Sequence, residues 1–310
     1  MPTRATAEGG GLEGDEGKFT SAFLLQRAAG HKVFAFLAQS KNLSAIRPEI
    51  RIVQFDMGAN GQPDFRQGIV ISDLHLFARR SRGAARFDSI RDRLDSADVL
   101  VLNGDIFDFR WSTLGDQEKT LPAAVNWLRN LATEFPGCQI HFVVGNHDCA
   151  GALLNELARL AVSLPRFRWH EHLLRLGPAL FFHGDCAHRP MDHRGLSRFR
   201  ENWRGNWRWN PAMATAYECV DRLGITRRIH EWHFPRRETV ERIAFYLDNT
   251  RPGWRAQTRD CFFGHTHLPF LNYTYDGIQF HNTGSGIHNL EFNPISFEAL
   301  PDRNVEAVSP

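Results

Sequence analysis

The sequence predicts an α/β fold in which helices are layered on a β-sheet, and three observations lead to this prediction. Five apolar runs of strand length each end in a cluster of Asp, His, Asn or Gly residues. Two helix-like segments lie between the first three runs. After the fifth run, two strand-like segments flank Asp276-Gly277, a dipeptide that favours a β-hairpin. Strands that alternate with helices indicate α/β layering around a sheet.

The five apolar runs begin at residues 68, 97, 138, 178 and 260. Their sequences are GIVISDLHL, ADVLVLNGDIFD, CQIHFVVGNHD, PALFFHGD and DCFFGHTH. The helix-like segments are residues 84–96, with Phe87, Ile90 and Leu94 at helical spacing, and residues 120–134, with Val125, Leu128 and Leu131. In such folds, functional groups gather where strands end and loops begin. We therefore expect the five polar strand ends to converge on one edge.

The chain divides by composition into an extension and a main domain. Residues 1–48 are expected to be an N-terminal extension, partly disordered because its first twenty residues are rich in Gly and Glu. Residues 21–40 are compatible with an amphipathic helix, and a peripheral helix is favoured over an interfacial membrane helix. Residues 49–310 form the expected main domain. Within it, residues 186–259 lack a strand-like run and hold five of the eight tryptophans, which predicts a helical insertion. The tail from about Pro294 shows no motif.

Composition narrows the class of protein and its compartment. A formal charge of +2 gives no general argument for a nucleic acid or an anionic membrane as partner. Five scattered cysteines without a C-x-x-C pair argue against a disulfide framework and a thiolate zinc site. No run reaches the roughly 18 apolar residues of a spanning helix. We expect a cytoplasmic protein, with peripheral contact to the membrane as an open alternative.

The polar strand ends carry the donors that a pair of divalent cations needs. Histidine nitrogens mixed with carboxylate and amide oxygens suit such ions. Asp73 and His75 stand two residues apart at one strand end, and Asp105 has two oxygens with which it can bridge two ions. The remaining candidate ligands are Asn146, His183, His265 and His267. Each strand end alone is weak support, but five of them in order predict a metal centre.

As a set, these motifs resemble those of the calcineurin-like metallophosphoesterase superfamily. They are Asp73-Leu74-His75, Gly104-Asp105-Ile106-Phe107-Asp108, Gly145-Asn146-His147-Asp148, His183 in FFHGD, and Gly264-His265-Thr266-His267. The resemblance spans about residues 68–286 and implies two mixed β-sheets packed face to face and flanked by helices. It also implies the ligand partition. Asp73, His75 and His267 would hold one ion, Asn146, His183 and His265 the other, and Asp105 would bridge them.

The chemistry expected of this centre is phosphoester hydrolysis. Two divalent cations outweigh the charges of Asp73, Asp105 and a bridging hydroxide, so an anionic phosphate is attracted. The bridging hydroxide would be the nucleophile, available at neutral pH because bound water acidifies. His147 is expected to protonate the leaving oxygen, with Asp148 or Asp108 orienting its ring. These donors accept Mn, Fe and Zn, and manganese is the metal we expect.

The substrate class is less constrained than the chemistry. The chain is similar to the UDP-2,3-diacylglucosamine diphosphatase family in ISDLHL, in NGDIFDFRWSTLGD and in HGDCAHRPMDHRGLSRFRENW. That similarity implies a nucleotide-lipid diphosphate as substrate, with residues 186–259 as a lid whose arginines and tryptophans bind it or only pack together. The chain departs from that family by having His147 where the family usually has Arg. A generic phosphodiesterase or phosphomonoesterase acting on nucleotides or nucleic acid is the alternative, and a non-catalytic scaffold on the same fold is a remote one.

Overall fold

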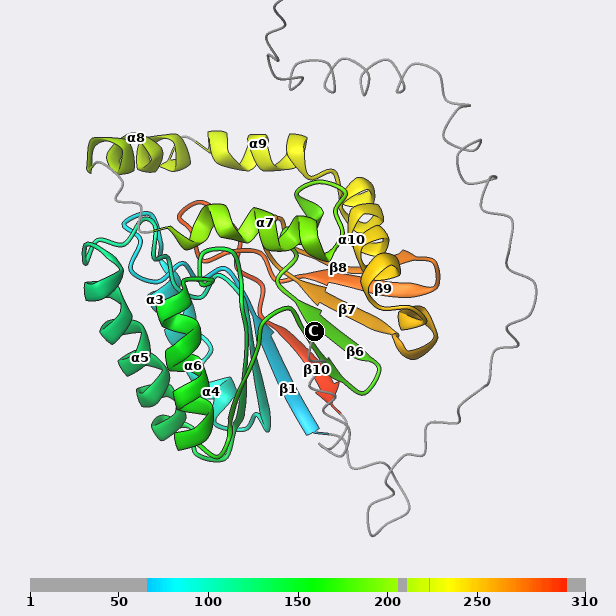
Figure 1. The fold of residues 1–310 in the computed structure, drawn as a ribbon, viewed down its shortest axis with the longest axis horizontal. Coiled ribbons are helices and arrows are strands. Elements are labelled where there is room, and N and C mark those ends of the chain that lie inside the picture. Colours follow the sequence, from blue (N-terminus) through cyan, green and yellow to red (C-terminus); the bar gives the residue numbers. More distant parts are fainter. Residues whose placement is uncertain (1–65, 206–210, 223, 300–310) are drawn as a thin grey trace, which may run out of the picture. The chain divides into compact units, whose positions relative to one another are not determined.

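The computed structural model describes residues 66–205, 211–222 and 224–299. The predicted N-terminal extension, including the helix expected within residues 21–40, lies outside these residues. Two five-stranded sheets form the centre of the described domain (Figure 1). The predicted α/β class, with two mixed sheets flanked by helices, is confirmed.

The first sheet has the strand order β10-β1-β2-β3-β4. Its strands are β1 (Arg66–Ile71), β2 (Val99–Asn103), β3 (Gln139–Val143), β4 (Phe167–His170) and β10 (Ile295–Ala299). Strands β1 to β4 are parallel, and β10 pairs antiparallel with β1, with Ile69 opposite Ser296. The tail in which the sequence shows no motif therefore supplies an edge strand.

The second sheet has the strand order β5-β6-β7-β9-β8. Its strands are β5 (Leu173–Leu176), β6 (Ala179–Phe182), β7 (Asp260–Phe263), β8 (Phe270–Tyr275) and β9 (Ile278–Asn282). The parallel pairs β6–β7 and β7–β9 lie at its centre. Strands β8 and β9 form the predicted hairpin, in which Asp276 and Gly277 both have positive φ, of 49° and 77°. Positive φ at both turn positions is the requirement of a type I′ hairpin turn.

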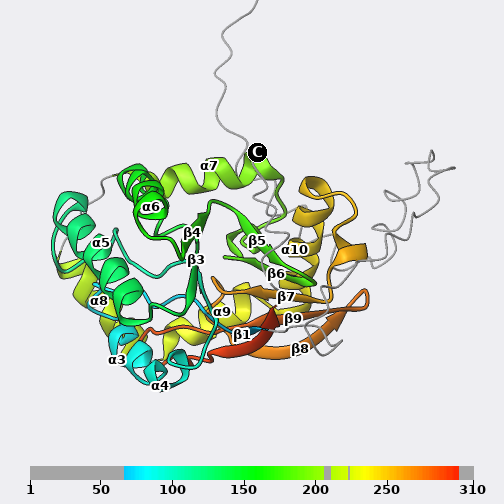
Figure 2. The ribbon, with the colours of Figure 1, turned by 90° about the horizontal axis from the view of Figure 1, so that it is seen from below.

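Helices cover the outer face of each sheet (Figures 1 and 2). Against the first sheet lie α3 (Gly83–Asp88), α4 (Arg91–Leu94), α5 (Gln117–Glu134) and α6 (Gly151–Ser163). The single helix predicted over residues 84–96 is thus two short helices, although Phe87, Ile90 and Leu94 are buried as expected. The second segment is one helix, α5, which buries Val125, Leu128 and Leu131.

The described part of residues 186–259 contains helices joined by short loops and no strand, as predicted. The helices are α7 (His193–Arg204), α8 (Pro211–Arg222), α9 (Ile225–His233) and α10 (Arg236–Thr250), with a 3₁₀ turn on each side, η1 (Asp185–Ala187) and η2 (Trp254–Gln257). Helices α7 and α10 pack on the second sheet. In Figure 1, α7, α8 and α9 lie across the end of the sheets at which β1 ends.

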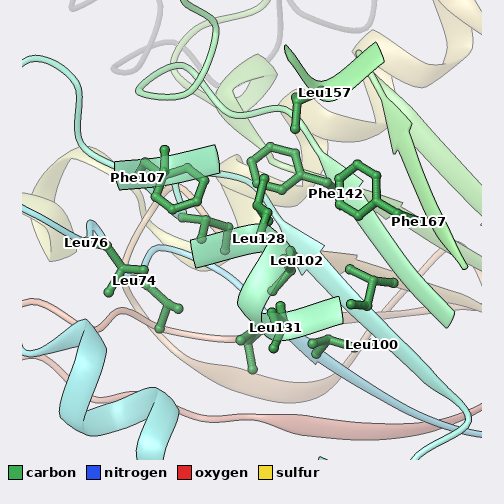
Figure 3. Packing of buried hydrophobic residues seen from close by; sticks show 14 of the residues in the cluster. Leu74, Leu76, Leu100, Leu102, Phe107, Leu128, Leu131, Phe142, Leu157 and Phe167 are labelled. Carbon is green, nitrogen blue, oxygen red and sulfur yellow. The ribbon is translucent and has the colours of Figure 1, made fainter. Parts of the chain in front are cut away.

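Three apolar layers hold these elements together. Stacked aromatic rings, among them Phe107 and Phe142 with centroids 6.0 Å apart, fill the space between the first sheet and its helices (Figure 3). A second layer joins the other sheet to α7 and α10. Between the two sheets, valines of β1 to β3 meet Leu174, Phe181 and Phe262. Burial on both faces explains why β2 and β3 read as continuous apolar runs rather than as alternating ones.

Candidate metal centre

The backbone turns sharply where the strands deliver the predicted ligands. Five of the seven predicted ligands have positive φ: Asp73 (51°), His75 (47°), Asp105 (52°), His265 (62°) and His267 (58°). Such a conformation is uncommon outside glycine, costs of order 1–3 kcal/mol per residue, and clusters at functional sites. The strand ends therefore hold these side chains at the expense of backbone strain.

Glycines in the motifs leave room for the ligands themselves. A Cβ at Gly104 would collide with the ring of His183. A Cβ at Gly145 would collide with the carboxylate of Asp105, and one at Gly264 with the carboxylate of Asp73. Only Gly104 of the three has positive φ, so Gly145 and Gly264 are required for close approach of a side chain rather than for backbone freedom.

The two sheets are joined beside the ligands by one buried amide. The side chain of Asn103, at the end of β2, donates to the backbone oxygens of Phe182 and Phe262, each at 3.0 Å. These oxygens belong to strands β6 and β7 of the other sheet. Asn103 therefore brings the ends of strands from both sheets together, although no feature of the sequence marks it as a functional residue.

Asp73, His75 and His267 form one cluster of ligand atoms. Nε2 of His267 lies 3.1 Å from Oδ1 of Asp73 and 3.3 Å from Nε2 of His75. Nε2 of His75 is 3.8 Å from Oδ1 of Asp73. All three side chains are buried, and each atom lies within 4.8 Å of the others.

Asp105, His183 and His265 form a second cluster next to the first. Nε2 of His183 lies 3.3 Å from Oδ2 of Asp105 and 3.2 Å from Oδ1 of Asn146. The same Oδ2 of Asp105 is 3.9 Å from Nε2 of His75, which belongs to the first cluster. The structure therefore brings all seven predicted ligands together, with Asp105 between the two groups.

The hydrogen bonds around the ligand atoms, as well as the types of these atoms, suit the binding of divalent cations. Nδ1 of His75 lies 3.2 Å from a carboxylate oxygen of Asp108, and Nδ1 of His183 lies 3.3 Å from the backbone oxygen of Asn103. Because these acceptors fix the proton on Nδ1, each Nε2 presents a lone pair to the centre. Within the described residues, Oδ1 of Asp73 and Nε2 of His265 are buried without a hydrogen-bond partner. Unpaired acceptors packed this closely fit a bound cation.

The pKa values of the candidate ligands are shifted by burial and by the neighbouring charges. Burial raises the pKa of Asp73 to about 6, with the neighbouring carboxylate of Asp105 adding to the effect and His183 opposing it. Burial lowers the pKa of His183, but the carboxylate of Asp105 outweighs it and brings the pKa to about 10. Burial instead lowers the pKa of His75, His265 and His267, which keeps these rings neutral, the form in which histidine binds a metal. Divalent cations would keep the carboxylates ionised.

His147 lies beside the two clusters and is held on three sides. Its Nδ1 is 2.9 Å from Oδ1 of Asp108, and its ring meets the ring of His75 edge-on at 4.7 Å. The ring of Trp203, from α7, lies 4.4 Å away between centroids. Burial lowers the pKa of His147, but the charges of Asp108 and Asp105 reverse this and raise it above its ordinary value.

Asp108 and Asp148 have different partners. Of the two carboxylates considered for orienting His147, Asp108 makes the contact. Both oxygens of Asp148 instead accept backbone N–H groups, from Ile106 at 3.0 Å and Phe107 at 2.9 Å. Asp148 therefore fixes the loop that follows β2, and through it the position of Asp105.

A cavity of about 370 Å³ opens over the ligands and is roofed by the insertion. Its apolar wall consists of Trp111, Phe199, Trp203, Ile229 and Phe234, and its polar lining includes Arg80, Arg110 and five histidines besides His147. Arg110 lies 4.6 Å over the ring of Trp203, and Arg80 lies 3.7 Å from Oδ2 of Asp108. Neither arginine belongs to one of the five motifs. Their positions shortly after the first two motifs are the only feature of the sequence that could have marked them as cavity residues.

The tryptophans of the insertion do not share one role. Trp203 lines the cavity, Trp254 is buried against the second sheet, and Trp232 is 80% exposed. Trp207 and Trp209 lie outside the described residues. The insertion therefore lines the cavity and also packs with the core.

Residues 69–269 match the calcineurin-like phosphoesterase family, and the chain belongs to this family. It is a metallophosphoesterase, and thus a hydrolase, whose clustered side chains are candidate metal ligands.

Three solved structures are similar at low identity. The phosphopantetheinyl hydrolase of Mycobacterium tuberculosis is 14% identical over 76% of this chain and 96% of its own, with a TM-score of 0.39. The E. coli phosphoesterase YfcE is 14% identical over 77% of this chain and 84% of its own, with a TM-score of 0.33. A dimetal phosphatase from Danio rerio is 11% identical over 76% and 93%, with a TM-score of 0.37. No curated protein matches the sequence.

Proposed function

We propose that this protein hydrolyses a phosphoester or diphosphate bond at a centre of two divalent cations. Asp73, His75 and His267 hold one cation, Asn146, His183 and His265 hold the other, and Asp105 is shared. The observation that carries this proposal is the placement of Oδ2 of Asp105 within 3.3 Å of His183 and 3.9 Å of His75, one from each cluster. When bound, two such cations supply an acidified water and neutralise charge that develops on the phosphate oxygens.

The side chains around the centre donate a proton, attract the phosphate and exclude water. Nδ1 of His147 holds a proton against Asp108, so Nε2 is the atom that carries a proton to the leaving oxygen. Arg80 and Arg110 line the same cavity and bring positive charge to the phosphate. The apolar wall from α7 and α9 excludes water from the side opposite the ligands.

Metal dependence is the first test of this function. Protein loaded with Mn²⁺, Fe²⁺ or Zn²⁺ is expected to hydrolyse bis(p-nitrophenyl) phosphate or p-nitrophenyl phosphate, and a chelator is expected to reduce the rate to background. Metal analysis should find two ions per chain, with manganese giving the highest rate. Metal-loaded protein that stays inert on a broad panel of phosphoesters would refute the proposal and favour a non-catalytic scaffold.

For the substrate we propose a nucleotide-linked lipid diphosphate such as UDP-2,3-diacylglucosamine, hydrolysed in the cytoplasm with peripheral contact to the membrane. Residues 186–259 contain fifteen arginines against eight Asp or Glu residues. Ile225, Ile229 and Trp232 form an exposed apolar stripe along α9, and Ile229 also lines the cavity. Basic charge beside an exposed apolar stripe is typical of interfacial helices. Among the residues that the structure describes, no helix has the length and apolar character of a membrane span.

The lipid-linked substrate can be separated from the generic alternative by comparing rates. UDP-2,3-diacylglucosamine in anionic vesicles is expected to release UMP, at a kcat/KM well above that of a soluble phosphodiester. Trp232→Ala should lower the vesicle rate and leave the soluble rate unchanged, whereas Val162→Ala, at a position 90% exposed on α6, should change neither. Absence of UMP release, together with good rates on nucleotides or nucleic acid, would identify a generic phosphodiesterase instead.

A further inference from the structure

A second cavity of about 240 Å³, here called the outer cavity, adjoins the metal centre. It shares His267 and Phe234 with the cavity over the ligands. Its other walls come from the ends of α9 and α10, from residues 266–270 after β7, and from Leu290 and Glu291. The proposed hydrolysis at the metal centre gives this cavity no role.

The first sign of a ligand is the outer nitrogen of His267. Its Nε2 faces Asp73 and His75, so the ring carries its proton on Nδ1 when that Nε2 binds a metal. The equivalent nitrogens of His75 and His183 each have an acceptor. Nδ1 of His267 is buried and has no hydrogen-bond partner in the part of the chain that the structure describes. Metal-binding histidines almost always donate from this nitrogen, so an acceptor is missing from the outer-cavity side.

The second sign is the hydroxyl of Thr239, on the opposite wall. Thr239 lines the outer cavity, is 1% exposed, and its Oγ1 lacks a hydrogen-bond partner among the described residues. It lies in the first turn of α10, whose N-terminus has no side-chain cap. The N-terminus of a fifteen-residue helix carries partial positive charge and N–H groups that favour an anion.

The charged residues that line the outer cavity are two arginines and two glutamates, and Glu238 adds a carboxylate to the first turn of α10, but the cation of Arg236 lies at the α10 end. The guanidinium of Arg236 lies 4.7 Å over the ring of Phe270, which holds it beside the opening. Arg227 is paired with Glu231 at 3.0 Å, so these two charges compensate each other. Glu291 lines the cavity from a different segment and opposes Arg236. Within this cavity, the region between Arg236, Thr239 and the α10 N-terminus is therefore the one where an anion would meet positive charge.

We infer that the outer cavity binds an oxyanion, a phosphate or carboxylate group, which accepts hydrogen bonds from Nδ1 of His267 and the hydroxyl of Thr239 and pairs with Arg236. The oxyanion is either a second acidic group of the substrate or free inorganic phosphate. The inference rests on the proposed function in one respect, the use of Nε2 of His267 as a metal ligand. It extends that function by giving the enzyme a second anion subsite directly behind the centre.

Binding of inorganic phosphate to metal-loaded protein tests the subsite without relying on turnover. Calorimetric titration of the Mn²⁺-loaded full chain with inorganic phosphate is expected to show, besides binding at the metal centre, a second saturable site. Arg236→Ala and Thr239→Val should each weaken it about tenfold or more, the usual loss for a hydrogen bond to a charged group. Arg237→Ala is the matched control: the neighbouring arginine pairs with Glu241 at 2.8 Å and does not line the cavity, so phosphate affinity should be unchanged.

Arg110→Ala distinguishes the outer cavity from the one over the ligands. If phosphate affinity falls only in Arg110→Ala, or if Arg236→Ala and Thr239→Val both bind phosphate normally, the inference is wrong. Arg236 is exposed, so loss of folding does not confuse its result. A protein that fails to hydrolyse any phosphoester still gives an interpretable titration, which keeps failure of the proposed function separate.

Inhibition of the metal-loaded enzyme identifies the source of the oxyanion. Uridine diphosphate and uridine monophosphate are compared as inhibitors of bis(p-nitrophenyl) phosphate hydrolysis. If the second phosphate of a substrate occupies the outer cavity, Arg236→Ala raises the inhibition constant of the diphosphate about tenfold and leaves that of the monophosphate unchanged. If free phosphate is the occupant, neither constant changes while phosphate affinity is lost. Either result supports the oxyanion site.

Discussion

His147→Ala is expected to lower kcat by about 10²–10⁴-fold, the usual contribution of a positioned proton donor, while both metal ions stay bound. His147 also forms a group of potential ligands with His75 and Asp105, but the two proposed ligand sets are complete without it and its Nδ1 faces Asp108. Metal analysis and steady-state rates on the same preparation measure the two effects. Loss of an ion together with activity would instead make His147 a ligand.

Comparing substrates whose leaving groups differ in basicity is the most specific test of the proton-donor role of His147. A proton donor matters most when the leaving oxygen is basic, so the loss should be large for an alkyl ester and small for a p-nitrophenyl ester. Asp108→Asn should show the same dependence in weaker form, because its oxygen holds Nδ1 of His147 at 2.9 Å. His193→Ala, at the start of α7, is the control and should leave both rates unchanged. Equal losses on the two esters would refute the proton-donor role.

The residues that cluster at the candidate metal centre could be predicted because each one follows an apolar run. Local pattern alone finds Asp73 after β1, Asp105 after β2 and His183 after β6. Convergence of the strand ends was expected, but the local pattern does not show which contacts join strands of two different sheets. These contacts include the bonds of Asn103 to Phe182 and Phe262, residues 79 and 159 positions away in the chain. An asparagine inside an apolar run gives no sign of such distant acceptors.

Elements defined by distant partners could not be predicted either. Strand β10 consists of only five residues, and it is a strand because Phe297 and its neighbours pair with β1, more than 220 positions earlier. The same holds for Asp148, whose partners are the backbone N–H groups of Ile106 and Phe107. In each case the deciding interaction lies outside the local pattern from which the prediction was made.

Arg200 is the clearest residue of this kind, and its replacement carries the largest expected effect on stability. It is 1% exposed, and its guanidinium donates to both oxygens of Asp185, at 2.7 Å and 3.1 Å. It also donates to the backbone oxygens of Glu171, at 2.6 Å, and Val144, at 2.9 Å. One side chain thus ties α7 to the loop that carries His183 and to the loop that carries Asn146 and His147.

Arg200→Met is expected to destabilise the protein by about 3–5 kcal/mol, because removing one partner of a buried ion pair leaves the other charge uncompensated. Urea unfolding of metal-free protein measures this change. Arg198→Ala, an exposed arginine on the same helix, should change stability by less than about 0.5 kcal/mol. An Arg200→Met variant as stable as the Arg198→Ala control would contradict the prediction.

The double variant Arg200→Met/Asp185→Leu separates the buried charge from the position of the helix. With both charges gone, it is expected to recover part of the stability, since buried ion pairs can be replaced by apolar groups at little cost. Activity should not recover with it, because the apolar pair cannot bond the oxygens of Val144 and Glu171 that set α7 over the site. Trp203, one turn further along α7, would then no longer be held against the ring of His147. Recovery of activity along with stability would show that the pair contributes charge balance alone.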